Sequence, residues 1–257
     1  MYPQIDLGSI TIYTFGLSLS ISFILFFWML YKLSLKFWIN TNFFLGNVFF
    51  FFISSFIFSR LFYVLAEWRD FKYALNGGFF KFFFMSDYNF SLIWGIVWFF
   101  IVLYINIKKF KLKWNKYIDA VVLSFLFAAI IWYIGTFLWW QVYGWPTDLP
   151  IWITYNNPLS KNPYSSPTFP LAIVYSILSF LLFTGLYITR IFVKIEGFIG
   201  YIWIIIFASF LLIFEFFNWS TDIFNSLIYV NLTQIWALGL ILIWIRWLRK
   251  IYKHENI

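Results

Sequence analysis

Seven long apolar stretches, separated by short polar or basic segments, dominate this chain of 257 residues. A transmembrane helix needs about 20 predominantly apolar residues to cross a hydrocarbon core of about 30 Å. The pattern therefore predicts an all-α, polytopic membrane protein with about seven transmembrane helices. The predicted spans are residues 10–31, 43–66, 90–107, 118–140, 169–189, 198–217 and 232–247.

The composition excludes the main alternatives to this fold. Hydrophobic residues make up 63% of the chain and charged residues only 11%, which is too little charge for the surface of a soluble domain. The chain has no Cys and one His, His254, in its tail, so we expect no metal, nucleotide or redox cofactor. The net charge of +8 could indicate nucleic-acid binding in a soluble protein, but here it reflects basic residues that flank the spans, and we expect no nucleic-acid partner.

The basic residues predict the orientation of the chain. They gather after the first span, between the third and fourth spans, between the fifth and sixth, and in the carboxyl-terminal tail. The positive-inside rule assigns these clusters to the cytoplasm, which places the amino terminus outside and the carboxyl terminus inside. We expect a single transmembrane domain, residues 1–257, with extracytoplasmic segments at about 67–89 and 141–168. Residues 67–89 mix charge, Gly and Phe, which favours an interfacial or half-inserted piece.

Two charged residues fall within predicted spans on the extracytoplasmic side. Arg60 lies below the outer end of the second span, and Glu215 lies near the outer end of the sixth. An isolated charge in hydrocarbon costs about 3 to 10 kcal/mol or more, so both are candidates for a functional site, where they could pair or line one cavity. The alternative is that Arg60 extends to lipid phosphate and Glu215 is simply interfacial.

Several polar side chains near the predicted outer surface could hydrogen-bond a lipid headgroup. Tyr13, Tyr63, Gln141 and Tyr143 have the required groups, although a Tyr in a membrane span more often packs or anchors at the interface. Asp119 lies beside the basic segment at 108–116, where an ordinary helix-end charge is the simpler interpretation.

Residues 133–152 contain the most abrupt change in the chain from apolar residues to polar and turn-forming residues. An apolar run passes through Gln141 and Tyr143 into a segment with Gly144, Pro146 and Pro150. Gly and Pro at this density predict a structured turn, here at the extracytoplasmic membrane surface.

The order and spacing of short motifs resemble the prolipoprotein diacylglyceryl transferases. That family's signature ends in Tyr-Gly-x-Pro-Thr-Asp-Leu-Pro, which residues 143–150 match in register. Residues 3–8 resemble its amino-terminal Pro, Ile and Leu-Gly, and residues 60–64 its Arg-Leu-Tyr-Tyr-Val string. Residues 166–169 correspond to its His-Pro-Thr-Gln motif. Each match is short, but together they cover nearly the whole chain in the family's order.

The resemblance implies a location and a chemistry. Members of that family lie in the bacterial plasma membrane and have seven spans with an outside amino terminus. They move the diacylglyceryl group of phosphatidylglycerol onto the lipobox Cys thiol of a preprolipoprotein. Such a reaction needs cations around the departing glycerol phosphate and a base or relay for the thiol.

This chain replaces most of the groups that carry out the family's chemistry. Tyr133 corresponds to the signature Arg, Gln141 to the signature Glu, and Ile93 to the His of the family's Ser-Phe-His-Gly-Gly motif. Within the signature, Thr136, Trp139 and Trp140 replace Asn and Gly residues. In the sixth span Glu215 remains, while the flanking Arg positions hold Leu211 and Asn218. Each lost Arg removes charge-assisted, often bidentate, bonds to phosphate.

We therefore interpret the chain as a relative that kept the fold but lost the standard site: a non-catalytic, lipid-binding scaffold or subunit of a membrane complex in lipoprotein biogenesis. Its expected partners are a membrane phospholipid such as phosphatidylglycerol, other membrane subunits, or lipoproteins. The alternatives are a diverged but active transferase, with Glu215, Arg60 and Gln141 as catalytic candidates, and a transporter component on the same architecture. The lipid-binding candidates are Arg60, Tyr13, Tyr63, Gln141, Tyr143, Glu215 and Asn218.

Overall fold

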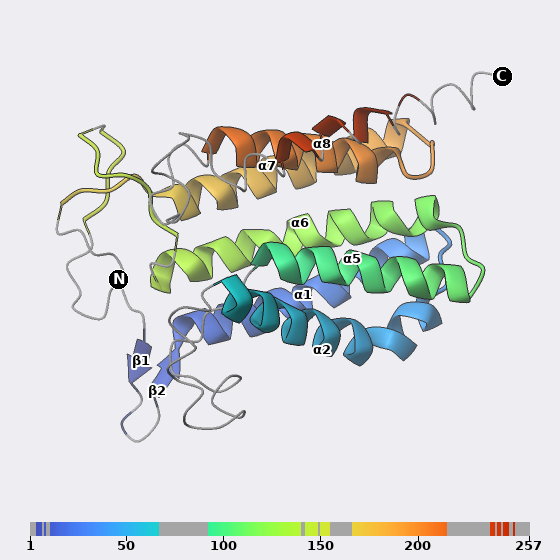
Figure 1. The fold of residues 1–257 in the computed structure, drawn as a ribbon, viewed down its shortest axis with the longest axis horizontal. Coiled ribbons are helices and arrows are strands. Elements are labelled where there is room, and N and C mark those ends of the chain that lie inside the picture. Colours follow the sequence, from blue (N-terminus) through green and yellow to red (C-terminus); the bar gives the residue numbers. More distant parts are fainter. Residues whose placement is uncertain are drawn as a thin grey trace. The chain divides into compact units, whose positions relative to one another are not determined.

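The computed structural model describes most of the predicted spans (Figure 1). It covers residues 4–6, 8, 11–66, 92–139, 142–148, 150–154, 166–214, 237–239, 241–242, 244–246 and 249. The chain forms two compact units, one made of residues 1–37 and 115–257 and the other of residues 38–114. Each unit is described by itself below.

The first unit is built on four helices: α1 (Thr14–Lys36), α6 (Trp114–Trp139), α7 (Leu171–Phe192) and the shorter α8 (Phe198–Phe214). Helix α6 is the central one. Half of its most apolar segment is buried, against 22% for α1 and 28% for α7. It contacts each of the other three helices, which leaves it less surface for lipid than its neighbours have.

Helices α1 and α6 pack antiparallel through small side chains. A Cβ atom added at Gly135 would collide with the Cβ of Ser18, so the two backbones approach as closely as a Gly permits. Aromatic pairs flank this crossing, with Phe15 against Trp132 at 5.9 Å between ring centroids and Trp28 against Phe127 at 6.0 Å. Small residues at such crossings allow the close van der Waals packing that stabilises helix pairs in membranes.

Helix α6 runs antiparallel to α7 and parallel to α8. The Ser176 hydroxyl of α7 donates a hydrogen bond of 2.9 Å to the Ile130 carbonyl of α6. On the α8 side, Phe125 packs edge-on against Trp203 at 5.6 Å. At one end of the unit, Lys36 of α1 donates a hydrogen bond of 2.7 Å to the Tyr187 hydroxyl of α7. We call this the Lys end.

The second unit pairs α2 (Thr41–Ala66) with α5 (Leu92–Lys109), also antiparallel. Stacked rings join the two helices, with Phe58 on Trp98 at 3.5 Å and Phe62 on Trp94 at 4.2 Å. A Cβ atom at Gly95 would lie 3.3 Å from the Cβ of Ser59, so a small residue again allows close approach.

Short extended segments lie at the end of the first unit opposite the Lys end. Strands β1 (Gln4–Asp6) and β2 (Thr11–Tyr13) form an antiparallel hairpin that leads into α1, and Gly8 in its turn has φ +82°. A positive φ is readily adopted only by Gly. The sequence patterns did not predict this hairpin.

The helices agree with six of the seven predicted spans, although the ends differ by a few residues. Four of them, α1, α2, α6 and α7, are long and apolar enough to cross a membrane, and α8 and the segment Ala237–Arg246 are shorter apolar helices. The predicted interfacial segment at 67–89 and most of the seventh span lie outside the described residues. The predicted orientation and the single domain remain predictions.

Candidate functional site

The signature segment begins on the last turns of α6. The Tyr133 ring packs against Tyr175 of α7, with 5.1 Å between ring centroids and 31° between their planes. Thr136 is buried, and its hydroxyl donates a hydrogen bond of 2.9 Å to the Tyr133 carbonyl. Trp139 packs edge-on against Tyr13 of β2 at 5.5 Å. The predicted lipid-binding residue Tyr13, 52% exposed, thus lies against the signature segment.

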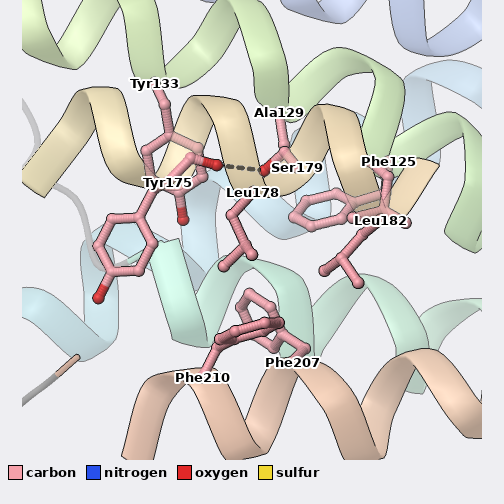
Figure 2. Close-up of a pocket in the computed structure, with 10 residues that line it drawn as sticks. Phe125, Ala129, Tyr133, Tyr175, Leu178, Ser179, Leu182, Phe207 and Phe210 are labelled. Carbon is pink, nitrogen blue, oxygen red and sulfur yellow. Dashed lines mark hydrogen bonds between the residues drawn. The ribbon is translucent and has the colours of Figure 1, made fainter. Parts of the chain in front are cut away.

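A pocket lies between α6, α7 and α8 beside Tyr133 (Figure 2). Figure 2 shows Tyr133 and Tyr175 together at one end, with Phe207 and Phe210 of α8 across from α7. The lining residues are Phe125, Leu126, Ala129, Tyr133, Tyr175, Leu178, Ser179, Leu182, Phe207 and Phe210. None of these described lining residues carries a charge.

The chemistry of the pocket follows from that lining. Its volume is about 20 Å³, room for about one water molecule or methyl group. Phosphate stabilisation needs cations or several converging N–H donors, and this lining supplies neither. The described lining residues accordingly suit an apolar group beside the rings of Tyr133 and Tyr175, and they offer no cation to a phosphate.

Arg60 lies in the second unit, and its charged side chain is buried. It is 1% exposed within α2, and its guanidinium carbon lies 5.6 Å from the centroid of the Tyr63 ring one turn later. A cation over an aromatic face gains about 0.5 to 2 kcal/mol. Two predicted lipid-binding residues, Arg60 and Tyr63, are thus brought together.

The turn predicted after α6 is a hydrogen-bonded ribbon. The Gly144 N–H donates to the Phe169 carbonyl at 2.9 Å, and the Thr147 N–H donates to the Pro167 carbonyl at 2.9 Å. Thr168 forms antiparallel bridges with both Pro146 and Ile153. Backbone pairing of this kind depends on Gly and Pro placement, which explains how a segment rich in both can be ordered. Tyr143, half-buried, directly precedes this ribbon.

The remaining site predictions are not tested by this geometry. Gln141, Glu215 and Asn218 lie outside the described residues, as does any pairing between Arg60 and Glu215. The Ile93 side chain is also outside them.

The sequence patterns missed one buried charged group. Asp119, interpreted as an ordinary helix-end charge, is 1% exposed and accepts two backbone hydrogen bonds from the start of α8. The available signal was the pair Gly197 and Gly200 at the beginning of an apolar span, since two Gly residues one turn apart allow another helix to approach closely. The partners Tyr175, Phe207 and Phe210 gave no such signal.

The long apolar helices and the buried charges within them define a multi-pass membrane protein. The family model for prolipoprotein diacylglyceryl transferases matches residues 4–249, nearly the whole chain. The chain belongs to the prolipoprotein diacylglyceryl transferase family. None of the curated proteins compared with the chain matches it.

Proposed function

We propose that this family member is a non-catalytic, lipid-binding subunit or scaffold in the bacterial plasma membrane. One observation carries the proposal: Tyr133, at the position of the family's signature Arg, packs its ring against Tyr175 beside an apolar pocket. The described groups around that position include no cation that could take the place of the missing guanidinium.

The loss of several catalytic and phosphate-binding groups together is stronger evidence against catalysis than the loss of one such group. Hydrogen bonds to charged groups are worth about 1.5 to 3 kcal/mol each, so a phosphate site without two or three Arg loses much of its stabilisation. The chain also has Gln141 where the family has Glu, and Ile93 where it has His. Neither replacement can act as a general base for a thiol.

The parts of the chain that form the scaffold are kept. The Ser18–Gly135 crossing depends on small residues, and the ribbon, which pairs residues 144–147 and 153 with residues 167–169, depends on Gly and Pro in fixed places. Retained packing with altered chemistry supports a role in binding rather than in transfer. The ligand we propose is a membrane phospholipid. In the second unit Arg60 and Tyr63 are the candidates for contact with a lipid phosphate, and in the first unit Tyr13 and Tyr143 are separate candidates for contact with a headgroup.

One observation favours the second candidate, a diverged but active transferase. Arg60 is a buried cation in an apolar helix, and burial of a charge at this cost is usually associated with a function. In this alternative Arg60 binds the departing phosphate, and Glu215 and Gln141 take part in the chemistry.

The test is a reconstituted transfer assay. The full chain in nanodiscs that contain phosphatidylglycerol is mixed with a lipobox peptide that bears Cys, and thioether formation is followed by mass spectrometry. A family member with the complete Arg, His and Glu set serves as the positive control. We expect no transfer by this chain but phospholipid retained after purification. Transfer that disappears in Arg60→Met or Glu215→Gln would overturn the non-catalytic proposal in favour of the second candidate.

A further inference from the structure

A carboxylate on one membrane helix binds the beginning of another. The two oxygens of Asp119, on α6, accept hydrogen bonds from the backbone N–H groups of Gly197, at 3.0 Å, and Gly200, at 2.9 Å. These N–H groups belong to the first turn of α8, where a helix has no internal acceptors for them. Asp119, which supplies both acceptors, precedes Gly197 by 78 positions in the chain.

The approach of α8 to α6 at this point requires Gly. A Cβ atom at Gly200 would lie 2.7 Å from Cγ1 of Ile118, and one at Gly197 would lie 3.0 Å from the Asn115 side chain. Gly197 also has φ +87°, which other residues adopt only with strain. The Asn115 side-chain oxygen accepts a further hydrogen bond of 2.8 Å from the Tyr201 hydroxyl. Residues of α6 and α8 therefore pack closely against one another around Asp119.

Arg190 is the obvious partner for a buried Asp, but its geometry is weaker. Its Nε lies 3.5 Å from an Asp119 oxygen and, among the described residues, makes no hydrogen bond. The same side chain donates from Nη1 to the Val193 carbonyl at 2.8 Å, and its guanidinium carbon lies 5.0 Å from the Phe37 ring centroid. Arg190 thus compensates the charge of Asp119 and orders the α7–α8 connection, while the short bonds of Asp119 go to α8.

We propose that Asp119 is a positioning residue for α8. Its carboxylate acts as the amino-terminal cap of a helix other than its own. The negative charge of the carboxylate also interacts favourably with the positive end of that helix's dipole. By fixing the first turn, it fixes the depth and rotation of α8 and so holds Phe207 and Phe210 against the pocket beside Tyr133. The inference does not depend on whether the protein is catalytic.

The simpler role for Asp119 is that of a counter-ion for Arg190. The two roles differ in what happens when both charges are removed. A counter-ion pair can be replaced by two neutral residues at little cost, because neither charge is then left unpaired. A cap cannot, because the two N–H groups of α8 remain without acceptors in an apolar surrounding.

The experiment measures where α8 lies in the full chain. Because the chain has no Cys, spin labels can be placed at Ile134→Cys on α6 and Ile213→Cys on α8, both exposed positions, and their separation measured by pulsed electron paramagnetic resonance in nanodiscs. Asp119→Ala and the double variant Asp119→Ala with Arg190→Gln are expected to give a shifted, broadened distance distribution. Arg190→Gln alone, which leaves both bonds from α8 to Asp119 in place, is expected to shift the distribution less than Asp119→Ala does. Ser124→Ala on α6, which removes only a bond to its own helix at Ala120, is the matched control.

Independent variants keep the proposal falsifiable if Asp119→Ala does not fold. Asp119→Asn keeps one acceptor and should shift the distribution less than Ala does. Gly200→Ala should reproduce the shift with Asp119 intact, and adding Ile118→Ala, which removes the atoms its methyl group meets, should reverse it. Recovery of the parental distribution in the Asp119→Ala, Arg190→Gln double variant would assign Asp119 a counter-ion role and overturn the proposal, as would an unchanged distribution in Gly200→Ala.

Discussion

The close approach of α1 and α6 at Gly135 gives a sharp prediction for stability. At the α1–α6 crossing, a methyl group added at Gly135 meets Ser18, which is itself buried. Two carbon atoms settle about 3.5 to 4.0 Å apart, so Gly135→Ala forces the helices apart or bends one of them. Overpacking by one methyl group costs about 1 to 3 kcal/mol.

A matched control separates this cost from helix propensity. Gly185, on α7, has nothing within 4 Å of an added Cβ atom, so Gly185→Ala gains the intrinsic preference of Ala for helix, about 0.5 to 1 kcal/mol, without a clash. Gly135→Ala has the same gain. The difference in free energy of unfolding between the two variants therefore isolates the packing term, and we expect it to be about 1 to 3 kcal/mol in favour of Gly185→Ala.

The assay is reversible unfolding in mixed micelles with increasing denaturing detergent, followed by intrinsic Trp fluorescence. The variant Ser18→Gly with Gly135→Ala removes the atoms that the new methyl group meets, and a double-mutant cycle should give a favourable coupling between the two changes. Equal stability of Gly135→Ala and Gly185→Ala, or no coupling with Ser18→Gly, would refute the close crossing.

Three further predictions concern binding, bonding and orientation. Arg60→Met should reduce the amount of anionic phospholipid that co-purifies with the chain, whereas Arg60→Lys should retain part of it. Lipid mass spectrometry measures the retained lipid in each variant. Equal retention by the two variants would contradict a contact between Arg60 and a lipid phosphate. Ser176→Ala removes the bond to the Ile130 carbonyl and should lower the free energy of unfolding by about 0.6 kcal/mol, a typical value for an interhelical bond in a membrane, in the same micelle assay. For orientation, Asp148→Cys should react with an impermeant maleimide in intact cells. Trp38→Cys, at a position that is 88% exposed, should react only after permeabilisation. The reverse result would invert the predicted topology.

The long apolar helices could be predicted from the sequence because a run of about 20 apolar residues favours a helix that is long enough to cross a membrane. Their ends were less accurate for a physical reason. The first span was predicted to end at residue 31, but α1 continues to Lys36, because long Lys side chains can remain in a helix while their ammonium groups extend toward water. The strands of the amino-terminal hairpin, with three residues each, are too short to give a periodic pattern.

Part of the candidate site could likewise be predicted from the sequence, and part of it could not. The turn after α6 was predictable, since Gly144, Pro146 and Pro150 act through their own backbone preferences. The environment of Tyr133 was not, because it depends on Tyr175 and Phe207, which come from helices far along the chain. Asp119 looked like a helix-end charge for the same reason: only the adjacency of α6 and α8 shows that its carboxylate meets the N–H groups of Gly197 and Gly200.

The central place of α6 has a consequence for biogenesis. Helix α1 is synthesised early, but the helix that contacts it at Ser18 is α6, which follows only after residues 38–113 have been made. Until then α1 must remain in the bilayer without its main partner, and its buried Ser22 and Ser34 hydroxyls face lipid or transient contacts. Retention of α1 by the insertion machinery until α6 arrives is the expected order of assembly, and α7 and α8 can then join a pair already formed.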